Sequence, residues 1–346
     1  MEGSRPVVAR RPFAAALVVA VVAAWLASCS TRGGGDRLTI YSGRQSELIA
    51  PLLEDFSDET GVGVDVRYGD SADLALLIDE EGDRSPADVF LSQSPGAVGF
   101  LDAGGRLTKL PDDVLDQVDE RFRAPDGDWV GISGRVRVLV YNAELVDPAD
   151  LPSSVFDVTD ERYRGQVGVA PTNASFQDFV TAMRESVGDD EASAWLEGLV
   201  ANDVRTYANN IAIVEAIGRG EIEYGLVNHY YNEEVKAENP DAASENYLFP
   251  NGDLGALILV TAVGVLDTVD DTADAERFVD FLLSKSAQQF YAEETLEYPL
   301  AAGVEPAVED LPPLAEIQSP ELDLASLGEQ LTATKQLIER SGLEQA

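Results

Sequence analysis

Residues 38–66 read LTIYSGRQSELIAPLLEDFSDETGVGVDV and hold the pattern that decides the fold class. The first four residues are strand-like, and Ser46 is a predicted N-cap for a helix that runs to Thr60 and stops at Gly61. Residues 62–66 then alternate between larger apolar and small or polar side chains, as a strand does. A strand, a helix and a second strand in this order predict an α/β fold with a mostly parallel sheet.

The same alternation continues along the chain. A helix is predicted at 72–81, a buried strand at 88–91 and another helix at 96–103. Two long extended segments, near 130–141 and 256–266, lie where the chain can cross between two lobes. A length of 346 residues is large for one hydrophobic core and natural for two. Because doubly wound sheets bind ligands at the carboxyl ends of their strands, two facing lobes would enclose a ligand cleft.

The N-terminal segment has the features of an export signal. A stretch with three arginines precedes an apolar run at 13–25, which is too short to span a bilayer. Residues 26–29, LASC, resemble the lipobox of bacterial lipoproteins. We therefore expect residues 1–28 to be a signal peptide, Cys29 to carry lipid, and residues 29–36 to form a flexible tether. The mature protein would face the periplasm or the cell exterior and be held to the membrane by its lipid.

Composition excludes several classes of function. Asp and Glu number 63 against 24 Lys and Arg, and a net charge of −39 makes nucleic acid an improbable partner. Acidic residues are scattered along the chain, which fits solubility in a saline habitat as well as cation attraction. The single cysteine and the single histidine, His229, leave little for thiolate or triad chemistry. We expect no enzyme, and a hydrolase that uses scattered carboxylates is a remote alternative.

Two adjacent tyrosines carry the most distinctive chemistry. Tyr230 and Tyr231 lie in the segment VNHYYN at 227–232, directly after a predicted strand at 224–227. Neighbouring side chains of a strand point to opposite faces, so the two phenols converge only if the chain bends there. Phenolate is a hard oxygen donor that suits Fe(III), and a bound cation lowers the pKa of its ligands. The alternative is that the two rings simply pack in a core or a cleft wall.

Several short motifs add a resemblance to a known family. In chain order they are YSG at 41–43, SPADVF at 85–90, SGRVRV at 133–138, PT at 171–172, YANN at 207–210, GEI at 220–222, NHYY at 228–231 and EYPL at 297–300. Each motif is weak by itself, but together, in this order and spacing, they resemble the ferric-ion-binding periplasmic proteins of bacterial iron ABC transporters. The resemblance covers nearly all of the mature chain.

The resemblance implies a two-lobed periplasmic-binding-protein type II fold, with a mostly parallel, helix-flanked sheet in each lobe and a ligand cleft between them. Tyr230 and Tyr231 would bind Fe(III), and phosphate or carbonate would complete its coordination as a synergistic anion. The protein would deliver iron to an ABC permease and act as a monomer. An oxyanion or a small organic solute is the alternative ligand. The expected lobes comprise 37–136 plus 262–310, and 137–261 plus 311–346.

The resemblance also suggests where the anion is held. Asn210 and the stretch Asn173, Ala174, Ser175 correspond to anion-binding positions of the family. A helix expected to begin at Phe176 supports the second position, because free N–H groups at a helix N-terminus attract anions. Ordinary N-capping by Asn173 or Ser175 is the alternative and needs no ligand.

Asn228 and His229 flank the tyrosine pair on its N-terminal side. We expect both residues to orient the phenol groups rather than to bind the ligand. Direct metal binding by His229 is the alternative.

The first lobe departs from the family pattern. Gln45 stands where the best-known members carry a histidine ligand, and Gln93 stands where they carry a glutamate ligand. Phe176 replaces the extra tyrosine of some relatives. A neutral amide is a poorer donor to Fe(III) than a carboxylate, so affinity and anion choice are open. Arg44 would either neutralise the anion or lie solvated at the cleft rim, and Ser94 is expected in the cleft.

Overall fold

The computed structural model describes residues 37–269, 271–308, 312–320, 322, 324, 326–328 and 330–346. Leu38 to Ala346 form one compact unit. The expected signal peptide at 1–28, Cys29 and the tether at 29–36 lie outside the described residues, so they stay predictions. No helix in the described part of the chain combines the length and apolar character required to cross a bilayer.

The described residues form eleven strands that pair in the order β2-β1-β3-β10-β5-β8-β6-β7, with β4 beside β10 and with β9 and β11 beside β5. Their bounds are β1 (Leu38–Ser42), β2 (Val64–Tyr68), β3 (Val89–Ser92), β4 (Leu107–Thr108), β5 (Trp129–Asn142), β6 (Val167–Val169), β7 (Arg205–Thr206), β8 (Tyr224–Asn228), β9 (Ser244–Tyr247), β10 (Ile258–Leu266) and β11 (Tyr298–Pro299). Parallel pairing of β1 with β2 and β3 confirms the prediction from the opening stretch.

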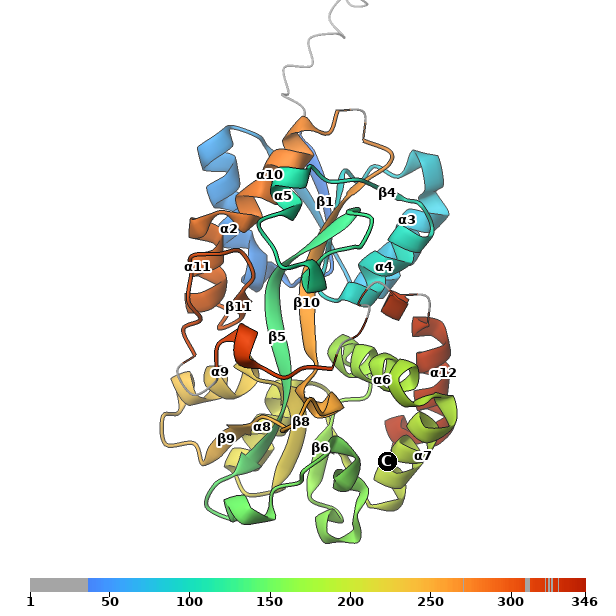
Figure 1. Ribbon diagram of the computed structural model, residues 1–346, viewed down its shortest axis with the longest axis vertical. Helices are drawn as coiled ribbons and strands as arrows, with labels where there is room; N and C mark the ends of the chain where they lie inside the picture. The colour runs from blue at the N-terminus through green and yellow to red at the C-terminus, as the bar shows by residue number, and fades with distance from the viewer. Residues whose placement is uncertain are drawn as a thin grey trace, which may run out of the picture. The chain divides into compact units, whose positions relative to one another are not determined.

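The strands β5 and β10 run side by side through the middle of the molecule (Figure 1). The two strands pair antiparallel with each other and, between them, with β3, β4, β8, β9 and β11, whereas β1 pairs parallel with β2 and β3, and β6 with β7 and β8. The sheet is therefore mixed, with its parallel pairs outside the two central strands. The first part of β5, up to Val136, pairs with β10, and the part from Arg137 onward pairs with β8 and β9. The two extended segments expected to cross between lobes are these strands, whereas the exact lobe boundaries stay a prediction.

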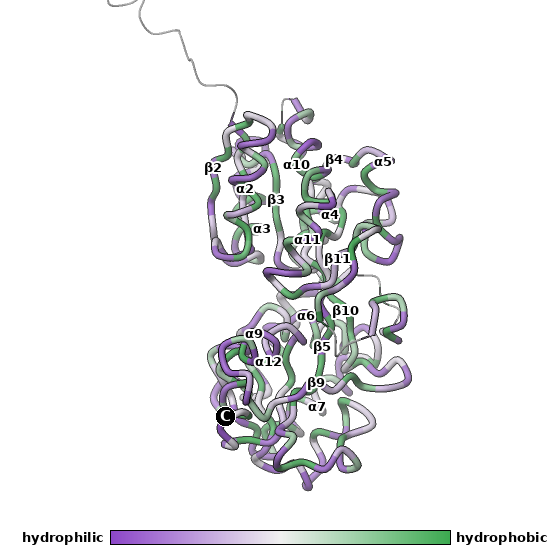
Figure 2. The backbone as a smooth tube through the Cα atoms, turned by 90° about the vertical axis from the view of Figure 1, so that its left-hand side faces the viewer, coloured by the Kyte–Doolittle hydropathy of each residue, from purple (hydrophilic) through white to green (hydrophobic). Residues whose placement is uncertain are grey.

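Helices cover both sides of the strands, with α2, α10 and α11 opposite α3 and α4, and with α8 and α9 opposite α6, α7 and α12 (Figure 1). Their bounds are α2 (Ser46–Thr60), α3 (Ser71–Glu81), α4 (Pro95–Ala103), α5 (Asp112–Leu115), α6 (Ala174–Val187), α7 (Asp189–Ala201), α8 (Asn210–Gly218), α9 (Tyr230–Glu238), α10 (Ala273–Leu283), α11 (Lys285–Glu293) and α12 (Leu331–Ser341). Figure 2 shows the central strands mainly in the hydrophobic colour and many outer turns in the hydrophilic one.

Two helix starts differ from the sequence expectation. Ser46 is the first helical residue of α2, and Gln45 occupies the N-cap position without a side-chain capping bond. The helix α6 begins at Ala174 rather than at Phe176.

The end of α2 provides a test of the backbone geometry. Gly61 adopts a left-handed φ of 76°, and a β-carbon added there would meet no neighbouring atom within 4 Å, so only backbone strain opposes a side chain. We expect Gly61→Ala to lower the free energy of unfolding by about 1–2 kcal/mol. Gly218, the last residue of α8, has equally open space and no positive φ, so Gly218→Ala should raise it by about 0.5–1 kcal/mol. Urea denaturation measures the free energy of unfolding of both variants. If the two substitutions change it in the same direction, the explanation by backbone strain is wrong.

Candidate functional site

The turn from β8 into α9 brings the two tyrosines together. β8 ends at Asn228, His229 occupies the N-cap position, and Tyr230 and Tyr231 are the first two residues of α9. Their ring centroids lie 4.2 Å apart with an angle of 40° between the planes. The bend that the two phenols need in order to converge is therefore present, and it allows neighbouring residues to face one space, which a continuing strand would not.

Both tyrosines line a cavity of about 520 Å³ whose wall also includes residues from the segments after β1, β2, β3 and β6. Such a volume is typical of small-molecule sites and is much larger than a bare metal ion needs. The lining residues are Gly43, Gln45, Glu47, Leu48, Asp70, Ser71, Gln93, Thr172, Asn173, Ala174, Ser175, Ala208, Asn209, Ile211, Tyr230, Tyr231 and Glu234. An ion bound by the tyrosines would leave room for an anion or a chelate.

Burial keeps the inner tyrosine protonated while the cavity is empty of cations. Tyr230 is 4% exposed, and Tyr231 is half-buried. Burial raises the pKa of Tyr230 well above its ordinary value, the neighbouring Tyr231 raises it further, and the positive charge of Arg135 only partly opposes this. A cation that binds the Tyr230 oxygen must therefore displace a proton, as metal ligands generally require.

His229 cannot offer a ring nitrogen to a ligand in this arrangement. The side chain is fully buried, its Nδ1 accepts a hydrogen bond from the Val136 N–H at 3.3 Å, and its Nε2 contacts the Leu296 carbonyl oxygen at 2.9 Å. Because Nδ1 accepts, the proton lies on Nε2, and burial lowers the pKa of this imidazole to about 4. The ring packs edge to face against Tyr230, with centroids 5.7 Å apart. These contacts favour the orienting role over direct metal binding.

Asn228, two residues before Tyr230, forms side-chain hydrogen bonds to two other elements. Its Oδ1 accepts from Arg137 Nη1 at 3.2 Å, and its Nδ2 donates to Ser175 Oγ at 3.1 Å. The side chain is fully buried, so both of its polar ends are satisfied inside the protein. Asn228 thereby links β5, β8 and the start of α6, which suits the expected orienting role.

The start of α6 lines the cavity but is already capped. Asn173 is the N-cap residue, and its Oδ1 accepts from the Ser175 N–H at 3.0 Å. The N–H of Phe176 donates to the Asn173 carbonyl oxygen at 3.0 Å. Ordinary capping therefore accounts for these bonds, and Asn173, Ala174 and Ser175 remain cavity-lining candidates for anion contact.

Asn210 lies behind the cavity wall rather than on it. It is 1% exposed and is the first residue of α8, whereas its neighbours Asn209 and Ile211 line the cavity. Asn209 caps α8 by accepting from the Ala212 N–H at 2.9 Å. Sequence order alone could not distinguish these two asparagines, because a one-residue shift at a helix start changes which side chain faces the ligand.

The segments after β1 and β3 present amides to the cavity. Gln45 is exposed at the start of α2, and Gln93 is half-buried directly after β3. The Gln93 N–H donates to Ser71 Oγ at 3.0 Å, and its carbonyl oxygen accepts from Arg135. Ser94 is buried at the N-cap of α4 and is not among the lining residues.

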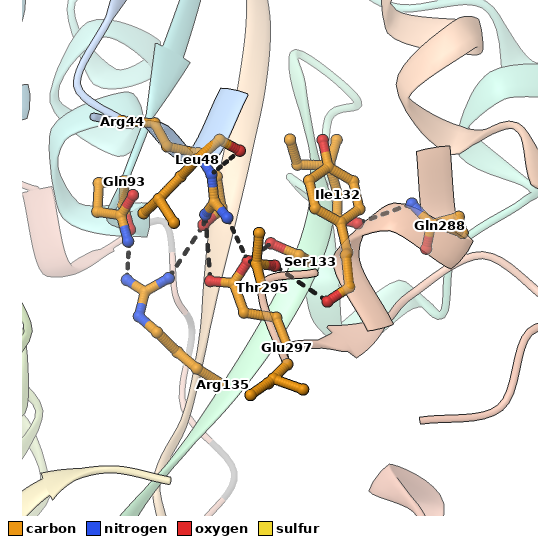
Figure 3. Close-up of polar contacts among 12 residues, drawn as sticks. Arg44, Leu48, Gln93, Ile132, Ser133, Arg135, Gln288, Thr295 and Glu297 are labelled. Carbon is orange, nitrogen blue, oxygen red and sulfur yellow. Dashed lines mark hydrogen bonds and ion pairs between the residues drawn. The ribbon is translucent and has the colours of Figure 1, made fainter. Parts of the chain in front are cut away.

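Arg44 is buried, so the expectation of a solvated charge at the cleft rim is wrong. It is 1% exposed and forms a bidentate ion pair with Glu297, at 2.6 Å for Nη2–Oε2 and 3.1 Å for Nη1–Oε1 (Figure 3). Ser133 and Thr295 hydroxyls donate to the same carboxylate at 3.0 and 3.1 Å. Burial alone would raise the pKa of Glu297, but Arg44 holds it below its ordinary value. Arg44 is thus neutralised inside the protein and does not line the cavity.

Two further buried arginines were not recognised from the sequence as parts of the site. Arg135 is fully buried and donates to Thr261 Oγ1 at 3.1 Å (Figure 3), and Arg137 donates to the Leu226 carbonyl oxygen at 3.0 Å. Neither has a carboxylate within ion-pair distance among the described residues. Burial lowers the pKa of Arg137 to about 10, and the nearby Tyr231 opposes that shift. The repeated Arg-Val-Arg in β5 was the available signal.

Glu234 was also missed, although its spacing from the tyrosines was a signal. It lies three residues after Tyr231 on the same helix and lines the cavity. Burial raises the pKa of this carboxyl to about 7, and the negative charge of Glu297 adds to the shift.

Known proteins resemble the chain over nearly its whole described length. The model of a family described as bacterial extracellular solute-binding protein matches residues 84–323. The major ferric iron-binding protein of Neisseria meningitidis serogroup A is 32% identical over 89% of this chain and 93% of that protein. Iron-bound HitA from Pseudomonas aeruginosa has 35% identity and a TM-score of 0.83, covering 89% of this chain and all of that one. A Trichodesmium protein in complex with iron and citrate has 26% identity and a TM-score of 0.77 over the same shares.

The buried ion pair leads to a stability test. Glu297→Gln leaves the Arg44 guanidinium buried without its compensating charge, so we expect the free energy of unfolding to fall by about 3–5 kcal/mol. Urea denaturation of the ligand-free protein measures this loss. As a control, Glu221→Gln breaks the exposed pair with Arg219, at 2.7 Å, and should leave stability unchanged. If both substitutions lowered the free energy of unfolding equally, burial would not explain the contribution of the Arg44–Glu297 pair.

Proposed function

This chain belongs to the bacterial extracellular solute-binding proteins, and we propose that it captures Fe(III) with Tyr230 and Tyr231 and delivers it to an ABC importer. The observation that carries the proposal is the pair of phenol groups at the start of α9, both lining one cavity. Two adjacent phenols can bind one ion through hard oxygen donors, and the similar proteins named for ferric iron support that ion.

The surroundings of the pair suit a cation that arrives with other ligands. The cavity of about 520 Å³ has room for an anion beside the metal. We propose that phosphate, carbonate or a chelate such as citrate completes the coordination, in contact with Asn173, Ala174 or Ser175. The buried guanidinium groups of Arg135 and Arg137 favour negative charge in this region, on a tyrosinate or on an anion.

Delivery requires the protein to report whether it is loaded. We propose that the parts of the chain joined by β5 and β10 close on the ligand, because a ligand that contacts both walls stabilises the closed state through its differential affinity. We also propose that the protein is a monomer anchored through lipid on Cys29 at the outer face of the cytoplasmic membrane, near the permease; the segment LASC at 26–29, which resembles a lipobox, supports the anchor.

A second candidate ligand is an oxyanion or a small organic solute without iron. Gln45 and Gln93 favour it, because both wall positions offer neutral amides where a cation would prefer anionic oxygen. The buried arginines are compatible with it too. Both ring nitrogens of the single histidine are engaged by backbone groups, which disfavours a hydrolase that depends on that residue; a hydrolase that uses carboxylates stays a remote alternative.

The tyrosine assignment is tested by visible spectroscopy. Tyrosinate bound to Fe(III) gives a visible charge-transfer band, so apo-protein titrated with iron citrate should become coloured. We expect Tyr230→Phe and Tyr231→Phe each to weaken or abolish the band and to reduce the apparent iron affinity more than about 100-fold, the upper end for groups that act only through a ligand. Tyr224→Phe, a buried tyrosine of β8 outside the cavity, is the matched control and should keep the band.

The two candidate ligands give different results in the same experiment. An iron binder becomes coloured, and phosphate alone raises its thermal unfolding temperature little. An oxyanion binder stays colourless with iron and is stabilised by phosphate alone. A band that survives unchanged in both tyrosine variants would refute the ligand assignment.

A further inference from the structure

One carboxylate shares the cavity face of the tyrosine helix. Glu234 is three residues after Tyr231 and four after Tyr230 on α9, and residues at these spacings lie on the same face of a helix. All three side chains line the cavity. The carboxylate of Glu234 is therefore presented to the same space as the two phenol groups, one helical turn further along.

Glu234 differs from the other two acids that line the cavity, Glu47 and Asp70. Asp70 is committed to the N-cap of α3, where Oδ1 accepts from the Ala72 N–H at 2.9 Å. Glu47 is exposed in the first turn of α2. Glu234 is half-buried and, in the part of the chain that the structure describes, its carboxylate has no hydrogen bond or ion pair. A partly buried charge without a partner is unfavourable until a cation compensates it.

The buried cation whose charge acts on Glu234, Arg44, does not compensate it. Arg44 lies close enough to influence it electrostatically, but its guanidinium is held in the bidentate pair with Glu297. Arg44 therefore attracts the Glu234 carboxylate only weakly, and Glu297 repels it. A cation between Glu234 and the tyrosines would relieve this repulsion directly.

The opposite wall explains why such a donor is needed. Gln45 and Gln93 present neutral amides, whereas hard cations prefer anionic oxygen ligands. We propose that Glu234 is a ligand of Fe(III) and supplies the anionic oxygen that the two glutamines cannot. Two tyrosinates and one carboxylate balance the three positive charges of the ion. The assignment rests on the proposed function, because it requires iron as the cargo, and it makes α9 the source of all three protein charges.

The test compares iron affinity among charge variants. Apo-protein and its variants are titrated with Fe(III) in the presence of increasing citrate, and the visible band reports the bound fraction. We expect Glu234→Gln to keep a tyrosinate band, shifted in wavelength, and to lose affinity by at least about tenfold, the lower end for groups near a metal. Glu234→Asp keeps the charge on a shorter side chain, so its affinity should lie between those of Glu234→Gln and the wild type.

The matched control is Glu238→Gln, which removes the same charge one turn further along α9, at an exposed residue outside the cavity. Its affinity should change much less than that of Glu234→Gln, because Glu238 acts on Glu234 only through its charge, from an exposed and screened position. Urea denaturation of each apo-variant shows whether it is folded. If Glu234→Gln does not fold, the comparison of Glu234→Asp with the wild type is the test.

The possible results distinguish the assignment of Glu234 as a ligand from the assignment of iron to the tyrosine pair. If the tyrosine variants lose the band while Glu234→Gln binds iron as tightly as the wild type, Glu234 is not a ligand and the proposed function stands. The same conclusion follows if Glu47→Gln, rather than Glu234→Gln, loses affinity. If the wild type forms no band at all, both assignments are overturned.

Discussion

The antiparallel pairing of β5 with β10 is the constraint on which the other features depend. The register shifts between Thr261 and Ala262, and near this irregularity Thr261 Oγ1 accepts hydrogen bonds from both Arg44 and Arg135, at 3.2 and 3.1 Å. Further along β5, Arg137 holds Asn228 at the end of β8. The two crossing strands thereby join the sheet to the turn that carries the tyrosines, and they do so through charged and polar side chains as well as backbone bonds.

The buried arginines near this pairing differ in how their charges are compensated. Arg44 and Glu297 neutralise each other, so their pair stabilises the fold and contributes little net field. Arg135 and Arg137 have no carboxylate partner within ion-pair distance among the described residues, and their positive field reaches the tyrosine pair. Buried guanidinium groups without a carboxylate partner favour negative charge at this site, either as tyrosinate or as an anion that accompanies a metal.

The donors around the cavity are unevenly distributed. One short helix, α9, carries Tyr230, Tyr231 and Glu234, whereas the facing segments offer the amides of Gln45 and Gln93, the exposed carboxylate of Glu47 and the Asp70 carboxylate, which caps α3. A cation would therefore be held mainly from one side, and the other wall would contribute hydrogen bonds, water or an exogenous anion. Such an arrangement suits a carrier, because a ligand held mainly by one wall can be released when the walls separate.

The sequence by itself determined the α/β class and the opening strand–helix–strand unit. Both follow from local periodicity and from a glycine stop at Gly61, neither of which requires distant contacts. The sequence also singled out Tyr230 and Tyr231 as hard oxygen donors, but only the turn from β8 into α9 showed that both residues line one cavity. The resemblance to iron-binding proteins was likewise visible in short motifs, and the comparisons with known proteins confirmed it.

Only the tertiary structure decided which polar residues face the cavity. Arg44 and Glu297 are 253 residues apart in the chain, so no local pattern could show that they pair and bury each other. Asn210 and Asn209 are neighbours with identical chemistry, and the first turn of α8 determined which of them lines the wall. Charge pairing and side-chain direction depend on how separate segments pack, and this is why the family resemblance could name the ligand class but not the complete set of donors.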